Sequence, residues 1–151
     1  MKCPTCKKGT IRGKGTIEHA ITVSGVKFSG KLAASLCSDC DEAIVEAGEL
    51  GRFECRIAEW FAEHGVCEPE VFRFMRKALG LRATDLAALL DVTGETVSRW
   101  ERGAVPVEHR ALALLGAMVS DRLAGREQTQ ARLQALREPA KVPRRVHLDV
   151  A

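Results

Sequence analysis

The amino-terminal part of the chain shows two kinds of hydrophobic pattern. Residues 16–23 and 26–36 are rich in β-branched and apolar side chains and flank the turn signal Ser24-Gly25. Two such runs on either side of a short polar turn predict a β-hairpin. Over residues 41–63, apolar residues recur at four-residue spacing, which predicts an amphipathic helix. The residues on its apolar face are Phe53, Ile57 and Phe61.

The rest of the chain is dominated by helical periodicity. The predicted helices cover residues 69–79, 83–90, 94–102 and 107–123, with a shorter one at 128–136. Thr93 is a favourable N-cap for the third helix, and Gly80 and Gly103 stand where the first and third helices are expected to end. These signals place a short turn at residues 91–93, between the second helix and the third.

The predicted helix over 94–102 separates its apolar and polar residues sharply. Val97 and Trp100 lie three residues apart and are expected to face inward, so that Trp100 anchors the helix. The side chains left on the outer face are Glu95, Thr96, Ser98, Arg99 and Arg102. A short helix, a tight turn and a second helix with a polar outer face predict a helix-turn-helix, whose second helix enters the major groove of DNA. Arg99 suits guanine and Glu95 suits cytosine, although the spacing fits equally well with Glu95 holding Arg99 in place.

Four of the six cysteines form two CxxC pairs, Cys3 with Cys6 and Cys37 with Cys40. Each pair has the spacing that tetrahedral zinc requires, and the predicted hairpin between the pairs brings them together. Four protein ligands close the coordination shell, so the prediction is one structural zinc ion per chain. A redox-active CxxC is the alternative, but the βαβ context of such motifs is absent. The remaining candidates, which match no usual ligand spacing and are interpreted as structural, are Cys55, His64 and Cys67.

The length of 151 residues allows one ordinary domain or two small ones, and the predicted hairpin and helices together indicate an α+β protein with two domains. We expect a zinc-binding domain over residues 1–66, an all-α DNA-binding domain over 67–122, and an extension over 123–151 that is partly helical or disordered. The longest apolar run, residues 111–119, is too short to cross a bilayer. The amino terminus lacks the apolar region of a signal peptide. These features predict a soluble, cytoplasmic protein with no membrane partner.

Charge adds a weak indication of nucleic-acid binding. Residues 1–66 are neutral overall, whereas residues 67–151 hold 14 Lys and Arg against 11 Asp and Glu. Twelve of these 14 cations are Arg, whose planar guanidinium suits phosphate and guanine. An enzyme that uses the CxxC thiols is a further alternative. It is disfavoured because the chain has no general-base constellation, no phosphate-binding glycine loop and no catalytic acid pair, so we expect no catalytic residues.

The central segment carries a connected set of motifs. They are Leu79-Gly80-Leu81, Asp85-Leu86-Ala87, Val92-Thr93, the run from Thr96 to Gly103, and Pro106. With these motifs, residues 68–120 resemble the Xre-type, lambda-repressor-like DNA-binding family. Two positions depart from the family pattern: Ala83 stands where Gln is frequent, and Asp91 stands where Gly is common.

This resemblance implies roles for individual residues. Gly94, Glu95 and Arg99 would face bases, and Arg82 and Thr93 would lie near phosphates. Glu101 would pair with a cation of the first helix of this segment, Arg76. Without the frequent Gln at position 83, contact with the DNA backbone is expected to be weaker.

The two parts of the chain together resemble a second family. The opening MKCPTCKKG and the later LCSDCDE, followed by the helix-turn-helix, resemble the MqsA-type antitoxins with their YgiT-type zinc finger. The resemblance covers residues 1–120. It implies a homodimer that binds a palindromic double-stranded DNA operator and represses its own promoter. It also implies structural zinc and a ribonuclease toxin bound through residues 1–66.

Two questions stay open at this point. An orphan zinc-containing regulator without a toxin partner is the alternative to an antitoxin. The apolar side of the predicted helix over 107–123 has two interpretations, a dimer interface or the core of one subunit. Its residues are Leu112, Leu115 and Val119.

Overall fold

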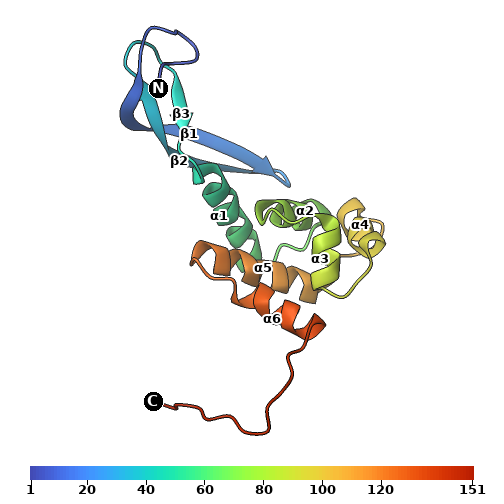
Figure 1. Ribbon diagram of the computed structural model, residues 1–151. Helices are drawn as coiled ribbons and strands as arrows, with labels where there is room; N and C mark the ends of the chain where they lie inside the picture. The colour runs from blue at the N-terminus through green and yellow to red at the C-terminus, as the bar shows by residue number, and fades with distance from the viewer.

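The computed structural model describes residues 1–151 as a three-stranded antiparallel sheet followed by six helices (Figure 1). The strands are β1 (Ile11–Val23), β2 (Val26–Cys37) and β3 (Ala43–Val45). The helices are α1 (Glu49–Glu63), α2 (Pro69–Ala78), α3 (Ala83–Leu89), α4 (Gly94–Arg102), α5 (His109–Leu123) and α6 (Gln128–Arg137). None of the helices combines the length and the apolar character needed to cross a membrane.

The predicted hairpin is confirmed. Strands β1 and β2 pair along their length, with Val23 opposite Val26. Ser24 and Gly25 both have positive φ, at 49° and 76°. Positive φ at both central residues is the geometry of the two-residue turn whose twist matches that of the flanking strands. The first strand begins at Ile11, earlier than predicted, so the hairpin is a long ribbon that projects from the helical part (Figure 1).

The predicted start of the first helix, at residue 41, is wrong. Residues 43–45 instead form β3, which pairs with β2 through residues 34–36. The helix begins only at Glu49, because Gly48 adopts the left-handed conformation with φ 83° and breaks any helical continuity with the preceding residues.

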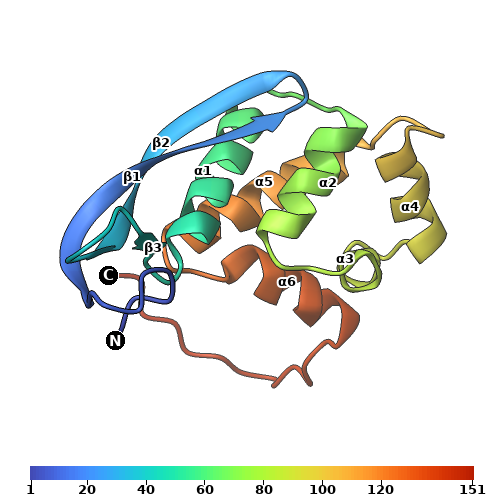
Figure 2. The same ribbon diagram turned by 90° about the horizontal axis from the view of Figure 1, so that it is seen from above.

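Helix α1 joins the sheet to the other helices. Ile57, Ala58 and Phe61 are buried in the same hydrophobic core as α2 to α5. The ring of Phe28, on β2, contacts that of Phe61 edge to face at a centroid distance of 5.2 Å. Figure 2 shows α1 lying between the ribbon and α5. The loop between α1 and α2, where the sequence predicts a domain division at residue 66, therefore connects elements that share one core.

The long helix α5 forms the base of this core. Leu112, Leu115 and Val119 are all buried within the chain. Their burial supports the interpretation as core, and the interpretation of this face as a dimer interface is wrong. The last helix, α6, agrees with the predicted helix at 128–136, and residues 138–151 are exposed without regular secondary structure.

Candidate nucleic-acid interface and metal centre

The boundaries of α4 are set by the residues that the sequence indicates. Thr93 is the N-cap, and its hydroxyl oxygen accepts a hydrogen bond of 3.1 Å from the backbone N–H of Thr96. Gly103 ends the helix with a left-handed φ of 72°. In the turn before α4, Asp91 also has positive φ, at 55°. That conformation explains why Gly is common at this position, since Asp is among the few other residues that adopt it readily.

The inner face of α4 is fixed by Trp100, as predicted. Its side chain is only 5% exposed, and Val97 beside it is fully buried. The indole ring meets the ring of Phe72, on α2, edge to face at a centroid distance of 5.5 Å. Edge-to-face contact is a favoured geometry for aromatic pairs. The large apolar ring in this polar helix therefore anchors α4 to the core and determines which side faces outward.

A largely buried ion pair also ties α4 to α2. The Arg76 guanidinium donates to both carboxylate oxygens of Glu101, at 2.5 and 3.1 Å. It donates in addition to the backbone carbonyl of Leu81, at 2.8 Å. Both side chains are largely shielded from solvent. The pairing implied by the Xre-type resemblance is thus present, and its bidentate geometry fixes the orientation of α4 as well as its position.

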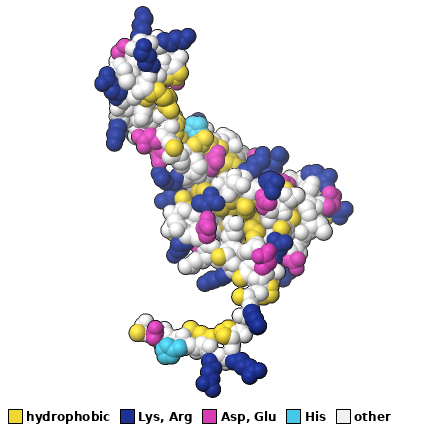
Figure 3. Space-filling view, in the orientation of Figure 1, with side chains coloured by type: hydrophobic (Ala, Val, Ile, Leu, Met, Phe, Trp, Pro, Cys, Tyr) yellow, Lys and Arg dark blue, Asp and Glu magenta, His cyan; other side chains and the backbone are white.

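The outer face of α4 carries a cluster of three charged side chains, Glu95, Arg99 and Arg102. One carboxylate oxygen of Glu95 accepts hydrogen bonds from both arginines, each at 3.1 Å. More than half of each of the three side chains is exposed. Because one carboxylate holds two guanidinium groups, this face keeps a net positive charge and orders both cations before any ligand arrives. Figure 3 shows Lys and Arg side chains over the flank where α4 lies.

The smaller predicted contact residues surround this cluster. Thr96 is half-buried, and its hydroxyl lies 2.9 Å from that of Thr93. Ser98 is also half-buried, and its carbonyl accepts from Arg102 at 3.3 Å. Gly94 is exposed at the start of the helix. The two threonines and Gly94 thus lie at the amino-terminal end of α4, where backbone N–H groups are available to an anion.

Arg82 lies outside α4, just before α3. Its guanidinium donates two hydrogen bonds of 3.0 Å to the carboxylate of Asp85, which itself accepts from the Arg82 backbone N–H at 3.2 Å. The hydrogen bond from Arg82 lowers the pKa of Asp85. The side chain of Arg82 is largely exposed, so it is accessible to a phosphate although it is engaged by an acid. The sequence did not indicate this partner for Arg82.

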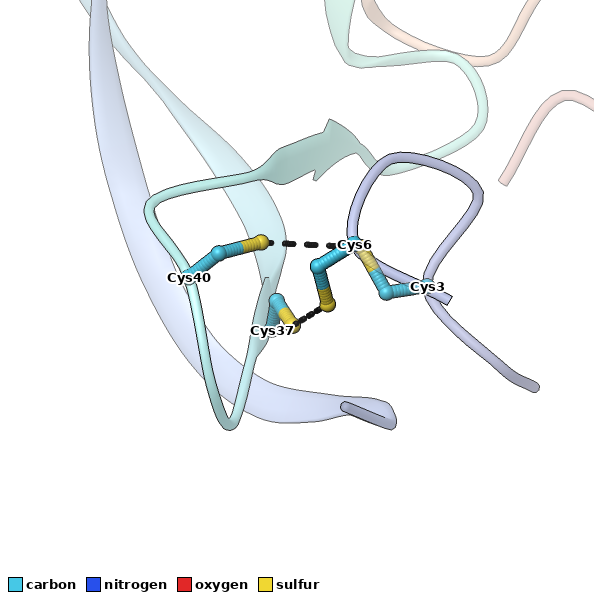
Figure 4. A group of neighbouring side chains, drawn as sticks. All are labelled: Cys3, Cys6, Cys37 and Cys40. Atoms are coloured by element: carbon cyan, nitrogen blue, oxygen red, sulfur yellow. Dashed lines mark hydrogen bonds between the residues drawn. The ribbon is translucent and has the colours of Figure 1, made fainter. Parts of the chain in front are cut away.

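The four predicted zinc ligands come together at the open end of the hairpin, opposite the turn at Ser24-Gly25 (Figure 4). The sulfur atoms of Cys3, Cys6, Cys37 and Cys40 all lie within 4.8 Å of one another. Two pairs are at 3.7 Å, Cys3 to Cys40, and 3.8 Å, Cys6 to Cys37. Four sulfurs at about 2.3 Å from a central zinc would be separated by about 3.8 Å in a tetrahedron. The spacing of the four sulfurs is therefore compatible with tetrahedral zinc.

Backbone N–H groups point at these sulfurs. Gly9 donates to Cys6 at 3.3 Å, and Asp39 donates to Cys37 at 3.4 Å. The N–H groups of Gly9 and Lys8 lower the pKa of Cys6 to about 7, which favours its thiolate, the form that binds metal. For Cys40 the N–H of Glu42 acts in the same direction. The neighbouring sulfur of Cys37 and burial outweigh it and raise the pKa of Cys40 to about 12.

The two pKa shifts differ in cause: backbone N–H groups lower the pKa of Cys6, whereas the neighbouring sulfur of Cys37 and burial raise that of Cys40. Thiolates around a common centre repel each other unless a cation compensates their charge, and a divalent metal supplies that charge.

The sequence analysis missed one residue that the cluster needs, Gly9. A Cβ atom there would lie 2.5 Å from the sulfur of Cys37. The glycine that follows the first pair in MKCPTCKKG was the available signal.

The other two cysteines lie away from this cluster. The thiol of Cys55, buried in α1, donates to the carbonyl of Ala78 at 3.6 Å. The thiol of Cys67 donates to the carbonyl of Val107, also at 3.6 Å. The imidazole of His64 lies 2.7 Å from the carbonyl of Trp60. These three residues contact three different parts of the chain and do not converge on a common point.

Comparison with known proteins finds one family match, in the central segment. Residues 72–118, from α2 to α5, match the family model described as helix-turn-helix. No curated protein matches the chain. The matched segment contains the buried Trp100, the Arg76–Glu101 pair and the exposed charged face of α4. Residues 72–118 are therefore a helix-turn-helix domain of the kind found in DNA-binding transcription regulators.

Proposed function

We propose that the protein is a sequence-specific repressor of its own promoter and binds a palindromic operator as a homodimer. The observation that supports this most directly is the outer face of α4. Trp100 fixes the helix from below, and Glu95, Arg99 and Arg102 stand exposed above it. In this proposal Arg99 reads a guanine, and Arg102 and Arg82 contact the DNA backbone. The backbone of Gly94, with Thr93, Thr96 and Ser98, completes the contact surface.

Glu95 has a specific place in this proposal. In the free protein its carboxylate holds both arginines. When Arg99 turns to a guanine, its bond to Glu95 is weakened, and the carboxylate becomes available to accept from a cytosine amino group. Glu95 thus acts first as a positioning residue for Arg99.

Arg99→Ala is expected to weaken binding to the DNA upstream of the protein's own gene by roughly 5- to 150-fold, because one bidentate contact to guanine is lost. Binding to unrelated DNA should change much less. Fluorescence anisotropy with the promoter fragment and a scrambled fragment measures both affinities. Arg52→Ala is the matched control, since Arg52 pairs with Glu49 on the exposed side of α1, away from α4. Equal promoter affinity for the two variants would rule out base recognition by Arg99.

We further propose that the protein is the antitoxin of a type II toxin–antitoxin pair. The proposal is supported by the order of the two parts, a hairpin with four cysteines at zinc geometry followed by a helix-turn-helix. Residues 1–66 would bind the toxin, an mRNA-cleaving ribonuclease, and the zinc ion would hold the hairpin in its binding conformation.

Co-expression with a ribonuclease encoded beside its gene is expected to restore growth of cells that the ribonuclease arrests. The full chain should co-purify with the ribonuclease, whereas Arg99→Ala should protect as well as the wild type does because α4 faces DNA. Growth assays and affinity purification provide the two readouts. If the neighbouring genes encode no ribonuclease, or if it neither co-purifies nor is neutralised, the protein is an orphan regulator.

A further inference from the structure

The net positive charge of the chain is confined to its last part. Residues 67–122, which contain the helix-turn-helix, hold eight Lys and Arg against eight Asp and Glu, so they are neutral overall, as residues 1–66 are. Residues 123–151 hold six Lys and Arg against three Asp and Glu, which accounts for the whole net charge of +3. Cations that neutralise phosphates supply much of the affinity of a protein for DNA. In this chain, the excess of such cations lies outside the helix-turn-helix.

The cations around α4 are engaged by acids of the same segment. Glu95 accepts from Arg99 and Arg102, and Asp85 accepts from Arg82. A phosphate that binds one of these arginines must therefore compete with a carboxylate. Phosphate contacts from another part of the chain would add affinity without breaking these pairs.

The segment that follows α6 carries cations that no acid engages. We call residues 139–148 the arm; it contains Lys141, Arg144 and Arg145 and no acidic residue. Every residue of the arm is exposed, and none of its three Lys and Arg side chains takes part in an ion pair. Figure 1 shows this segment leaving the end of α6, and Figure 3 shows Lys and Arg side chains projecting from it.

The start of the arm is held beside the turn that precedes α4. Arg137, the last residue of α6, lines the same surface hollow as Asp91. Asp91 lies two residues before Thr93, the N-cap of α4. The other end of α6 is fixed by the buried Asp121, whose carboxylate accepts a hydrogen bond of 2.7 Å from the backbone N–H of Thr129. Helix α6 therefore places the arm next to the amino-terminal end of α4.

The arm is long enough to extend past the groove that α4 is proposed to enter. Pro139 and Pro143 favour an extended backbone, because proline disfavours the helical conformation of the residue before it. The eight residues from Arg137 to Arg145 can span about 26–29 Å when extended, against about 12 Å for the width of the major groove. No backbone hydrogen bond involves a residue after Glu138, so none fixes the direction of the arm.

We infer that the arm is a second DNA contact, which binds phosphates beside the operator through Lys141, Arg144 and Arg145. Its ligand is the sugar-phosphate backbone of double-stranded DNA, so the contact carries no information about base sequence. The inference rests on the proposed binding of DNA by α4 and adds a division of roles to it. The arm supplies affinity that a neutral helix-turn-helix segment lacks, and α4 supplies the choice of sequence.

A full chain with Lys141→Ala, Arg144→Ala and Arg145→Ala is expected to bind both the promoter fragment and a scrambled fragment at least about 10-fold more weakly at about 100 mM salt, because up to three phosphate contacts are lost. The ratio of the two affinities should stay the same. The slope of log affinity against log salt concentration should become less steep by up to about 2.7 for each bound arm, at about 0.9 per phosphate. Fluorescence anisotropy in a salt series measures all three quantities.

Two further variants control for charge and for geometry. A chain with Lys14→Ala, Lys27→Ala and Lys31→Ala loses the same charge from exposed positions of the sheet and should keep most of its DNA affinity. Arg144→Lys combined with Arg145→Lys should also keep most of it, since a phosphate contact requires the charge and not the guanidinium. An unchanged salt slope in the arm variant, or an equal loss of affinity in the sheet variant, would overturn the inference.

The proposed function fails in a different way. Equal binding of the wild type to the promoter and scrambled fragments would disprove sequence-specific repression, and the inference would stand if the arm variant bound both fragments more weakly. Conversely, a promoter preference that depends on Arg99, with wild-type affinity in the arm variant, would disprove the inference alone. Wild-type DNA affinity together with loss of ribonuclease co-purification would assign the arm to a protein partner and would also overturn it.

Discussion

Cys37→Ser is expected to release zinc and to unfold the open end of the hairpin, where the four cysteines lie. The metal contributes about 10–16 kcal/mol in small zinc-finger peptides, and the end of this hairpin has little apolar core to replace it. Cys3 is the one deeply buried side chain among the ligands, and most residues around it are exposed. The loss should stop before α1, because Ile57 and Phe61 remain packed in the helical core.

Metal analysis and amide hydrogen exchange measure this outcome. The wild type should hold one zinc ion per chain, and the variant should hold far less. Exchange should accelerate in residues 1–15 and 36–46 and stay slow in α1 and α5. Cys67→Ser is the matched control, since a serine hydroxyl can also donate to the carbonyl of Val107. Full zinc content in the Cys37→Ser protein would mean that the cluster is not a four-cysteine zinc site.

Trp100→Ala is expected to lower the free energy of unfolding of the helical part by about 3–5 kcal/mol, the usual cost of removing a buried aromatic side chain. The indole is buried between α4 and α2. The substitution would leave the ring of Phe72 without its aromatic partner and would open a cavity. Because the net stability of a protein is only about 5–15 kcal/mol, this loss is a large fraction of the total. Promoter binding should fall together with helix content.

The second tryptophan provides the comparison. Trp60, on α1, stacks on His64 and is 38% exposed. Trp60→Ala should therefore cost clearly less than Trp100→Ala. Urea denaturation followed by circular dichroism compares the two variants without depending on tryptophan fluorescence. Equal midpoints would show that Trp100 is not the anchor of α4.

The helices of the central segment could be predicted closely because local signals mark both of their ends. Thr93, Gly80 and Gly103 each act where the sequence indicates, and the three-residue spacing of Val97 and Trp100 is sufficient to orient α4. The clustering of the four cysteines could be predicted from spacing in the same way, since a hairpin leaves few ways to arrange two CxxC pairs.

Other features depend on contacts between distant parts of the chain. The apolar residues at 43–45 find partners on β2, and this pairing, with the break at Gly48, prevails over the helical pattern that begins downstream. The pair of Ile44 and Val45, both β-branched, was a signal against helix in that stretch. In the sequence, the apolar pattern of α5 fits a core and a dimer interface equally well. Only the packing of α1 and α2 against α5 distinguishes the two.

The shared core of α1 and α5 has a mechanical consequence. Gly116 of α5 lies so close to α1 that an added Cβ would be 2.9 Å from that of Ala62, and only three residues connect β3, the last strand of the sheet, to α1. The ribbon is therefore joined to the helix-turn-helix segment through a packed helix and not through a flexible linker. A partner that binds the four-cysteine end of the ribbon would therefore keep a fixed orientation relative to α4.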